Sequence, residues 1–180
     1  MMLTNQNTVL TLIDIQEKLV HAMHEKDRLI DQLKILIRGM TCMGLPVLWL
    51  EQYPKGLGPT IPEVAELLYQ TGPIEKTSFS AWGSAEYRQE LQSLGRSNVL
   101  IAGIESHICV YQTAYDLLKE GYQTGVIIDA TTSRTNANHK IGVDRMSQLG
   151  VASTSVEMSL FELVKTANSA KFKTIAALLK

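Results

Sequence analysis

The sequence predicts an α/β protein, a three-layer α/β/α sandwich with a central, mostly parallel six-stranded sheet. Short apolar segments rich in β-branched residues alternate along the chain with longer segments whose apolar residues recur at helical spacing. Several of the short segments are continuous apolar runs, which is typical of parallel strands covered on both faces. The 180 residues show no repeat or linker that would divide them, so we expect a single domain over residues 1–180.

The strands are expected where these apolar segments end in polar or turn-forming residues. They span residues 9–15, 46–50, 72–77, 99–104, 124–129 and 151–154. The second is followed by residues 51–59, which contain two prolines and two glycines and are typical of a loop.

The helices are expected where apolar residues recur every three or four positions. They cover residues 29–43, 60–69, 84–94, a segment after residue 104, and residues 136–149, 155–164 and 169–179. Thr60 and Glu63 have the spacing of a capping box at the start of the second helix. Three helices are followed by a glycine suited to a C-cap: Gly44, Gly95 and Gly121.

Composition narrows the class of partner. The formal net charge is −1 and there is no basic cluster, which argues against nucleic acid or an anionic membrane as the main partner. The N-terminus lacks the layout of a signal peptide, and no apolar run approaches membrane-spanning length. Two cysteines far apart in the chain give neither a disulfide framework nor a metal motif. We therefore expect a cytoplasmic protein that acts on a small molecule.

Cys109 has the most informative position in the chain. It follows the buried strand at residues 99–104 and falls in the first turn of the next helix. Unpaired backbone N–H groups and the positive end of the helix dipole favour a thiolate there, which suits a nucleophile. The alternative is a small buried hydrophobic residue without chemistry, as most cysteines are.

Asp14 lies at the end of the first strand of the predicted sheet, and Lys76 at the end of the third. The carboxyl ends of parallel strands meet at one edge, where such sheets bind ligands, so both side chains should lie near Cys109. Lys76 would stabilise the thiolate and Asp14 would transfer its proton. Taken singly, the aspartate also fits a turn cap and the lysine a solvated surface position.

Three motifs in this order resemble the isochorismatase-like cysteine hydrolases: Leu12-Ile-Asp-Ile-Gln, Lys76-Thr-Ser-Phe-Ser-Ala-Trp and Val99-Leu-Ile-Ala-Gly-Ile-Glu-Ser-His-Ile-Cys-Val. The resemblance runs from about residue 9 to residue 163. It implies a catalytic Asp14, Lys76 and Cys109, and a cis peptide between Ile104 and Glu105. It also implies an oxyanion hole formed by the N–H groups of Glu105 and Cys109.

The expected reaction is hydrolysis of a small amide, imide or ureido C–N bond through a thioester on the cysteine. Members of this family are usually homo-oligomers, and apolar residues of the last two helices are candidates for a subunit interface: Phe161, Leu163, Ile175, Leu178 and Leu179. Four residues are candidates for the substrate pocket, although the three aromatic ones also suit a core: Gln16, Tyr53, Phe79 and Trp82.

No metal or other cofactor is expected. Family members with a metal site have an Asp-x-His arrangement after the second strand, whereas this chain reads Trp49-Leu-Glu-Gln-Tyr-Pro, so Glu51 is expected to face solvent or accept hydrogen bonds. Three other functions remain open: hydrolysis of an isochorismate-type vinyl ether, a non-catalytic oligomeric binding domain, and a redox thiol that would need Cys42 to reach Cys109.

Overall fold

The computed structural model of the protein describes residues 1–69 and 71–180, built around a sheet of six strands. The strands are β1 (Thr8–Ile13), β2 (Val47–Gln52), β3 (Ile74–Lys76), β4 (Asn98–Ile104), β5 (Gln123–Thr132) and β6 (Ala152–Thr154). Their order in the sheet is β3-β2-β1-β4-β5-β6, and every neighbouring pair is parallel. The predicted six-stranded sheet is confirmed, and the direction of winding reverses between β1 and β4.

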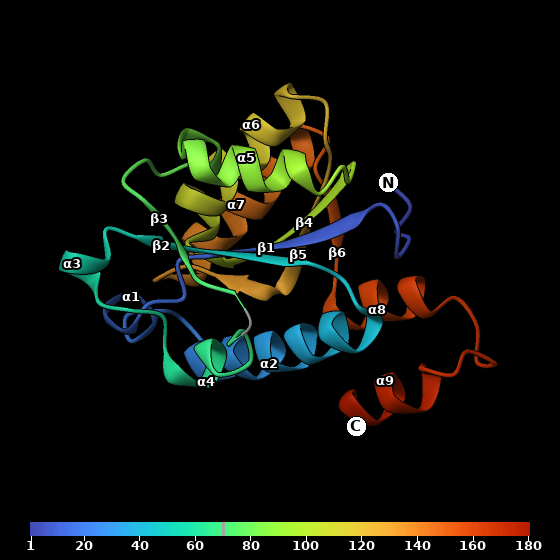
Figure 1. Cartoon of the computed structure of the whole chain (residues 1–180). Helices are drawn as coiled ribbons and strands as arrows, with labels where there is room; N and C mark the ends of the chain where they lie inside the picture. The colour runs from blue at the N-terminus through green and yellow to red at the C-terminus, as the bar shows by residue number, and fades with distance from the viewer. Residues whose placement is uncertain (70) are drawn as a thin grey trace.

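Helices cover both faces of this sheet, as Figure 1 shows. One layer contains α2 (Lys26–Met43), α4 (Pro62–Ala65), α8 (Val156–Val164) and α9 (Phe172–Leu178). The other contains α5 (Ala85–Ser93), α6 (Tyr111–Lys119) and α7 (Asn136–Gln148). Two short helices, α1 (Glu17–Val20) and α3 (Pro54–Leu57), lie in the connections after β1 and β2.

The strand β1 explains why the sheet needs both layers. All six of its residues are buried. Leu10 and Leu12 belong to the core beneath α2, whereas Val9 and Ile13 belong to the core beneath α5 and α6. Because successive side chains of a strand point to opposite faces, a continuous apolar run requires cover on both sides.

The helix expected over residues 60–69 is the main local difference from the sequence prediction. It covers only Pro62–Ala65, its N-cap is Ile61, and no side chain caps it. Pro62 starts the helix because its fixed φ and missing N–H suit a first helical position. Thr60 instead donates its backbone N–H to Glu51 Oε1, at 2.7 Å.

The last two helices pack on their own chain. Leu163 and Ile175, expected at a subunit interface, are 2% and 0% exposed in the core shared with α2. Phe161 is the more exposed of the set and packs on Phe172, with ring centroids 6.2 Å apart. Within residues 1–69 and 71–180, none of the helices combines the length and apolar character needed to cross a membrane.

Candidate active site

Asp14, Lys76 and Cys109 come from the carboxyl ends of three strands of the sheet. Asp14 directly follows β1, Lys76 ends β3, and Cys109 lies in a π-helical turn, Ser106–Val110, between β4 and α6. We call this segment the π-turn. The site therefore lies at the carboxyl edge, beside the point where the winding of the sheet reverses, as expected for an open α/β sheet.

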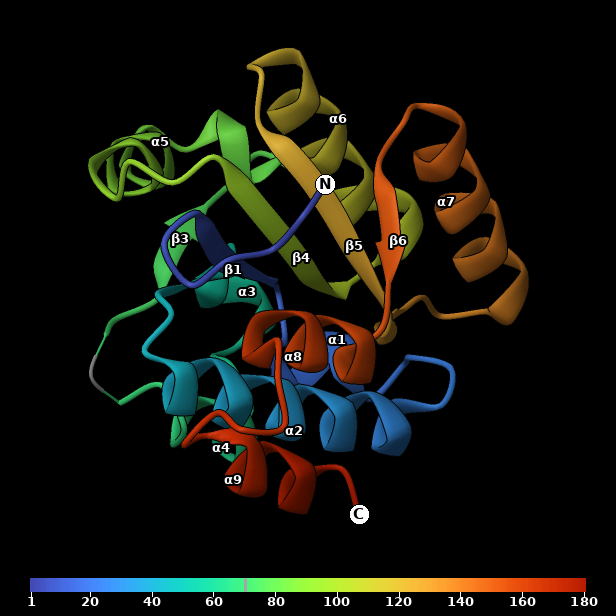
Figure 2. The ribbon, with the colours of Figure 1, turned by 90° about the vertical axis from the view of Figure 1, so that its right-hand side faces the viewer.

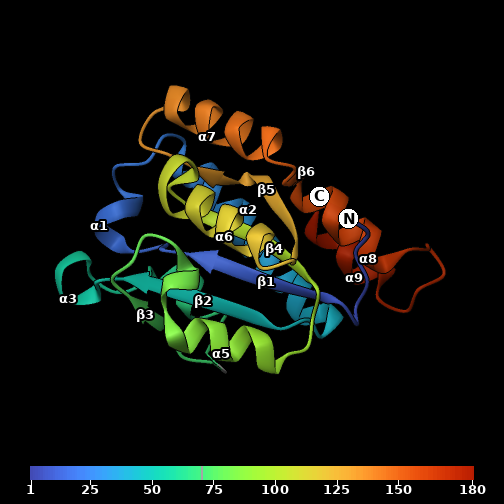
Figure 3. The same cartoon turned by 90° about the horizontal axis from the view of Figure 1, so that it is seen from above.

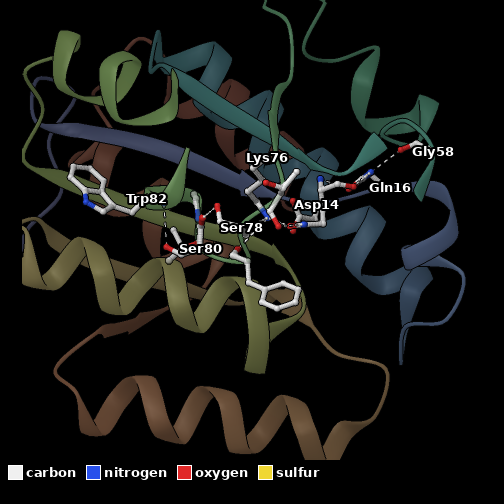
Figure 4. Close-up of polar contacts among 12 residues, drawn as sticks. Asp14, Gln16, Gly58, Lys76, Ser78, Ser80 and Trp82 are labelled. Atoms are coloured by element: carbon white, nitrogen blue, oxygen red, sulfur yellow. Dashed lines mark hydrogen bonds and ion pairs between the residues drawn. The ribbon is translucent and has the colours of Figure 1, made fainter. Parts of the chain in front are cut away.

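Asp14 and Lys76 form a buried ion pair (Figure 4). Lys76 Nζ donates to Asp14 Oδ2 at 2.8 Å, and neither side chain has any exposed surface. Asp14 has a φ of 55°, in the left-handed region, and its N–H donates to Leu50 O at 3.2 Å. Burial raises the pKa of Asp14, and the charge and hydrogen bond of Lys76 oppose this shift.

Gln52, which the sequence reasoning did not single out, is a further partner of the lysine. Its Oε1 accepts from Lys76 Nζ at 2.6 Å, and its Nε2 donates to Thr77 O at 2.8 Å. The backbone carbonyls of Ser78 and Phe79 complete the acceptors around the ammonium, at 3.3 and 3.2 Å. The one sequence feature that could have indicated Gln52 is its position as the last residue of β2, which ends at the same edge of the sheet as β1 and β3.

Gln16, a candidate for the substrate pocket, makes three hydrogen bonds to the backbone of its own chain. It is fully buried, its Oε1 accepts from Gln52 N at 2.7 Å, and its Nε2 donates to Gln52 O and Gly58 O at 2.9 and 2.7 Å. These bonds use both of its amide protons. The side chain therefore fixes the end of β2, and with it Gln52, relative to the loop that ends at Gly58 (Figure 4).

Cys109 is 8% exposed and lies beside the Asp14 carboxylate. Burial, followed by the negative charge of Asp14, raises the pKa of the Cys109 thiol to about 12, while Lys76 acts in the opposite direction. This corrects the expectation of a lowered pKa, because the position in the π-turn does not outweigh burial next to an anion. Asp14 Oδ1 makes no well-formed hydrogen bond in the described part of the chain.

Glu105 anchors the start of the π-turn. The expected cis peptide between Ile104 and Glu105 is confirmed. The Glu105 carboxylate accepts from Arg134 at three atoms, N, Nε and Nη2, at 3.0, 3.1 and 2.7 Å. Burial opposes ionisation, but these hydrogen bonds outweigh it and lower the pKa of Glu105. The Glu105 carbonyl accepts the N–H groups of Ile108 and Val110, and makes no such bond with Cys109 N.

The three aromatic candidates occupy different surroundings. Tyr53 is 55% exposed and lines a cavity of about 400 Å³ together with Lys76 and the residues that follow it. Phe79 is also 55% exposed. Trp82 instead packs edge-on against Tyr122, with ring centroids 5.9 Å apart, and its ring is turned away from Asp14 and Lys76 in Figure 4. Trp82 is partly buried and packs against the core beneath α5 and α6.

The two cysteines are free and lie in different cores. Cys42 packs against the core beneath α2, whereas Cys109 belongs to the core beneath α5 and α6, on the other face of the sheet. The sheet therefore separates them, and a Cys42–Cys109 disulfide does not fit this fold. Among the described residues, no group of three or more His, Cys, Asp or Glu side chains is arranged to hold a metal ion.

Comparison with known proteins gives a consistent picture. The sequence profile of the Isochorismatase domain matches residues 8–158. Isochorismatase domain-containing protein 2 of Danio rerio is 36% identical over 179 residues, covering 98% of this chain and 89% of that protein. Isochorismatase domain-containing protein 2 of Bos taurus is 34% identical over 174 residues, covering 97% and 83%.

Solved structures agree over nearly the whole chain. A structure described as MAR1 ribonuclease from Caenorhabditis elegans has a TM-score of 0.93 at 33% identity, covering 99% of this chain and 92% of that one. The YcaC gene product of Escherichia coli, described as an octameric hydrolase of unknown specificity, has a TM-score of 0.89 and covers 99% and 87%. At 22% identity, the second likeness shows the fold alone.

Proposed function

The chain belongs to the isochorismatase family, and on this premise we propose that it is a hydrolase whose nucleophile is Cys109. Its substrate class is a small amide, imide or ureido compound with a C–N bond to be cleaved. The observation that carries the proposal is the buried Lys76–Asp14 pair, 2.8 Å between Nζ and Oδ2, next to a buried thiol. A carboxylate, an ammonium and a thiol held together out of water are the parts of an activated nucleophile.

The reaction begins with transfer of the Cys109 proton to Asp14 as the sulfur attacks the substrate carbonyl. The N–H groups of Glu105 and Cys109 are the proposed donors to the oxyanion, where one such donor contributes about 3 kcal/mol to lowering the barrier. Asp14 then returns the proton to the departing nitrogen, leaving a thioester. Water attacks the thioester, gives its proton to Asp14, and the acid leaves as the thiol is restored.

The raised pKa of Cys109 determines when the thiolate forms. With a pKa of about 12, the thiol is protonated at neutral pH. The proton therefore moves when a carbonyl is present to receive the sulfur, and Asp14, whose own pKa is raised by burial, is a suitable acceptor.

The test is a search for the acyl-enzyme. A panel of small amides, imides and ureides is screened for ammonia or amine release, and acid-quenched protein is weighed by mass spectrometry. We expect turnover and an acyl adduct in the wild type and in Cys42→Ala, and neither in Cys109→Ala. Equal turnover in Cys109→Ala and the wild type would refute a cysteine nucleophile.

Hydrolysis of a vinyl ether is the second candidate, because one observation favours it. Asp14 has a raised pKa and, among the residues that the structure describes, its Oδ1 has no well-formed hydrogen bond; a protonated carboxyl group is what ether cleavage requires of an acid. This reaction needs no thiol, so it predicts that Cys109→Ala retains turnover of an enol ether while Asp14→Asn loses it. A non-catalytic binding domain predicts turnover in neither assay.

A ribonuclease activity, suggested by the name of the C. elegans structure, receives no comparable support from this chain. The formal net charge is −1, and RNA binding draws on phosphate contacts with clustered basic residues. Both cysteines are free thiols, which fits the reducing cytoplasm that we propose as the location.

A homo-oligomer is also part of the proposal. The E. coli protein that shares this fold is described as octameric, and Met158 and Phe161 on α8 are 61% and 36% exposed. They lie three residues apart and so on one face of the helix. Light scattering after gel filtration should give a multiple of the 20.0 kDa chain mass, and a mass of 20.0 kDa would contradict an oligomer.

A further inference from the structure

Helix α7 packs directly against the π-turn, the segment that carries Cys109. Figures 2 and 3 both show α7 beside α6, the helix into which the π-turn continues. Gly142 lies at this contact, where an added Cβ would come within 2.7 Å of Ser106 C and of His107 N. The lack of a side chain at Gly142 lets the two backbones come this close. One face of α7 is therefore seated on the start of the π-turn.

His139 bonds to the π-turn from the same face of α7. It lies three residues before Gly142, and positions three apart in a helix are neighbours on its surface. Its Nδ1 lies 2.8 Å from the Oγ of Ser106, the first residue of the π-turn. A serine beside an imidazole is also the arrangement of a nucleophile and its base, but Ser106 has no exposed surface from which to reach a substrate. The bond therefore holds the π-turn in place.

The residues on either side of Ser106 are tied to the same part of the chain. Glu105 accepts three hydrogen bonds from Arg134. His107 Nδ1 makes a hydrogen bond of 3.0 Å with Ser133 Oγ. Three consecutive residues are thus bonded to the loop before α7 or to the first turn of that helix. This set of bonds fixes where the π-turn begins.

The register of the π-turn determines which acceptor the Cys109 N–H can meet. In an α-helix, the carbonyl of Glu105 would accept the N–H of the residue four positions later, which is Cys109. Here that carbonyl accepts the N–H groups of Ile108 and Val110, at 3.0 and 3.2 Å. The bond to Val110 spans five residues, as in a π-helix. This register therefore keeps the Cys109 N–H out of the bond that an α-helix would give it.

The bond between His139 and Ser106 opposes a slip into the α-helical register. Val110, at the end of the π-turn, is fully buried in the core beneath α5 and α6. With that end held, a slip of one residue would rotate the start of the turn by about 100° around the helix axis. Ser106 would then move away from His139, and its buried hydroxyl would lose this partner, which is costly. The contact with α7 therefore stabilises the π register.

We propose that His139 is a positioning residue: through Ser106 it holds the π register and thereby keeps the Cys109 N–H directed at the substrate oxyanion. This role rests on the proposed function, in which that N–H is one of the two oxyanion donors. His139 acts on the reaction only through Ser106. Burial lowers the pKa of His139, so its ring is neutral at pH 7. Asparagine, whose amide reaches the position of Nδ1, is therefore its conservative replacement.

The first measurement is the hydrogen-exchange rate of the Cys109 amide. Labelling with ¹⁵N-cysteine gives two amide signals, because the chain has two cysteines, and Cys42→Ala assigns them. In His139→Leu and in Ser106→Ala, the Cys109 amide should exchange about tenfold more slowly than in the wild type, because it exchanges from the fraction of molecules that keeps the π register. His139→Asn should retain the wild-type rate. A mere loss of stability would act in the opposite direction, since an opened structure exchanges faster.

The second measurement is turnover of the best substrate from the amide panel. In His139→Leu, kcat should fall about tenfold at an unchanged KM, because an oxyanion donor acts only in the transition state. This is less than the roughly 100-fold loss that follows removal of such a donor, because the bonds of Glu105 and His107 remain. A double variant, with Ser106→Ala and His139→Leu together, should be no slower than either single variant, because both remove the same bond. His139→Asn should keep the wild-type kcat.

The matched control is Tyr87→Phe, which also removes one buried hydroxyl. The Tyr87 hydroxyl lies 2.9 Å from Thr11 Oγ1, and both residues are fully buried, on α5 and β1. Tyr87→Phe should neither slow the exchange of the Cys109 amide nor lower kcat.

The role of His139 is overturned if the Cys109 amide exchanges no more slowly in His139→Leu and Ser106→Ala than in Tyr87→Phe. An equal fall of kcat in all three variants would overturn it as well. If exchange slows as expected but Cys109→Ala turns over the substrate as fast as the wild type, the cysteine mechanism fails while the role of His139 in the register stands.

Discussion

Replacing Asp14 by asparagine should make Cys109 more reactive toward an alkylating reagent while abolishing hydrolysis. The carboxylate raises the pKa of the Cys109 thiol, so its neutral amide lowers that pKa while Lys76 stays in place. A charge at this range shifts a pKa by about two units. From a pKa of about 12, the thiolate fraction at pH 8 then rises about 100-fold. The lower nucleophilicity of the less basic thiolate offsets about tenfold of this, leaving a net gain of about tenfold.

The assay is the rate of iodoacetamide labelling of Cys109 between pH 6 and 10, measured by mass spectrometry in a Cys42→Ala background. Asp14→Asn should label faster than its parent throughout this pH range. Lys76→Met should label more slowly, because it removes the cation that lowers this pKa. If Asp14→Asn labels more slowly than its parent, the carboxylate does not raise the thiol pKa and our reading of the site fails.

Three further predictions concern how the site is held. Arg134→Gln should destabilise the protein by about 1 kcal/mol at pH 7. The pKa of Glu105 is lowered in the folded protein, so the wild type should be more stable than the variant at pH values above the unfolded pKa of about 4.3. This difference in stability, measured by urea unfolding, should vanish as the pH falls below that value. Gly142→Ala places a Cβ 2.7 Å from the backbone of the π-turn and should lower the free energy of unfolding by about 3 kcal/mol. Gly39→Ala should lower it by less, because its Cβ would meet only a flexible leucine side chain. Gln16→Ala should lower the unfolding free energy by about 2 kcal/mol; unchanged stability with a raised KM would show a substrate contact instead.

The layered fold was predictable because its signal is local and repeated. Continuous apolar runs such as residues 99–104 indicated parallel strands buried on both faces, and glycines such as Gly44 marked helix ends. The helix boundaries near residue 60 were not predictable in the same way, because Pro62 competes with the Thr60 capping pattern and fixes the start of the helix. The packing of α8 and α9 on α2 was not predictable either, because it depends on contacts between segments far apart in the chain.

The juxtaposition of the three candidate residues was predictable, but its electrostatics were not. Asp14 and Cys109 follow strands and Lys76 ends one, so the topology alone brings them to one edge. Gln52 was missed because an amide at the end of β2 has no motif of its own, and only the fold shows that it faces Lys76. The high pKa of the thiol was missed because it depends on burial and on an anion at close range.

The raised pKa values of Asp14 and Cys109 are two aspects of one charge balance. With a carboxylate, an ammonium and a neutral thiol, the buried site holds one negative and one positive charge. Ionising the thiol while Asp14 stays charged would place two anions beside a single cation, and burial penalises that state. Moving the proton from sulfur to Asp14 leaves the total charge unchanged, so Lys76 remains paired in both states. Asp14 Oδ2 is committed to Lys76, whereas Oδ1 has no well-formed hydrogen bond among the described residues, so Oδ1 is the atom that we expect to receive the proton. The two groups then titrate as a pair, and substituting either one should change the pH dependence attributed to the other.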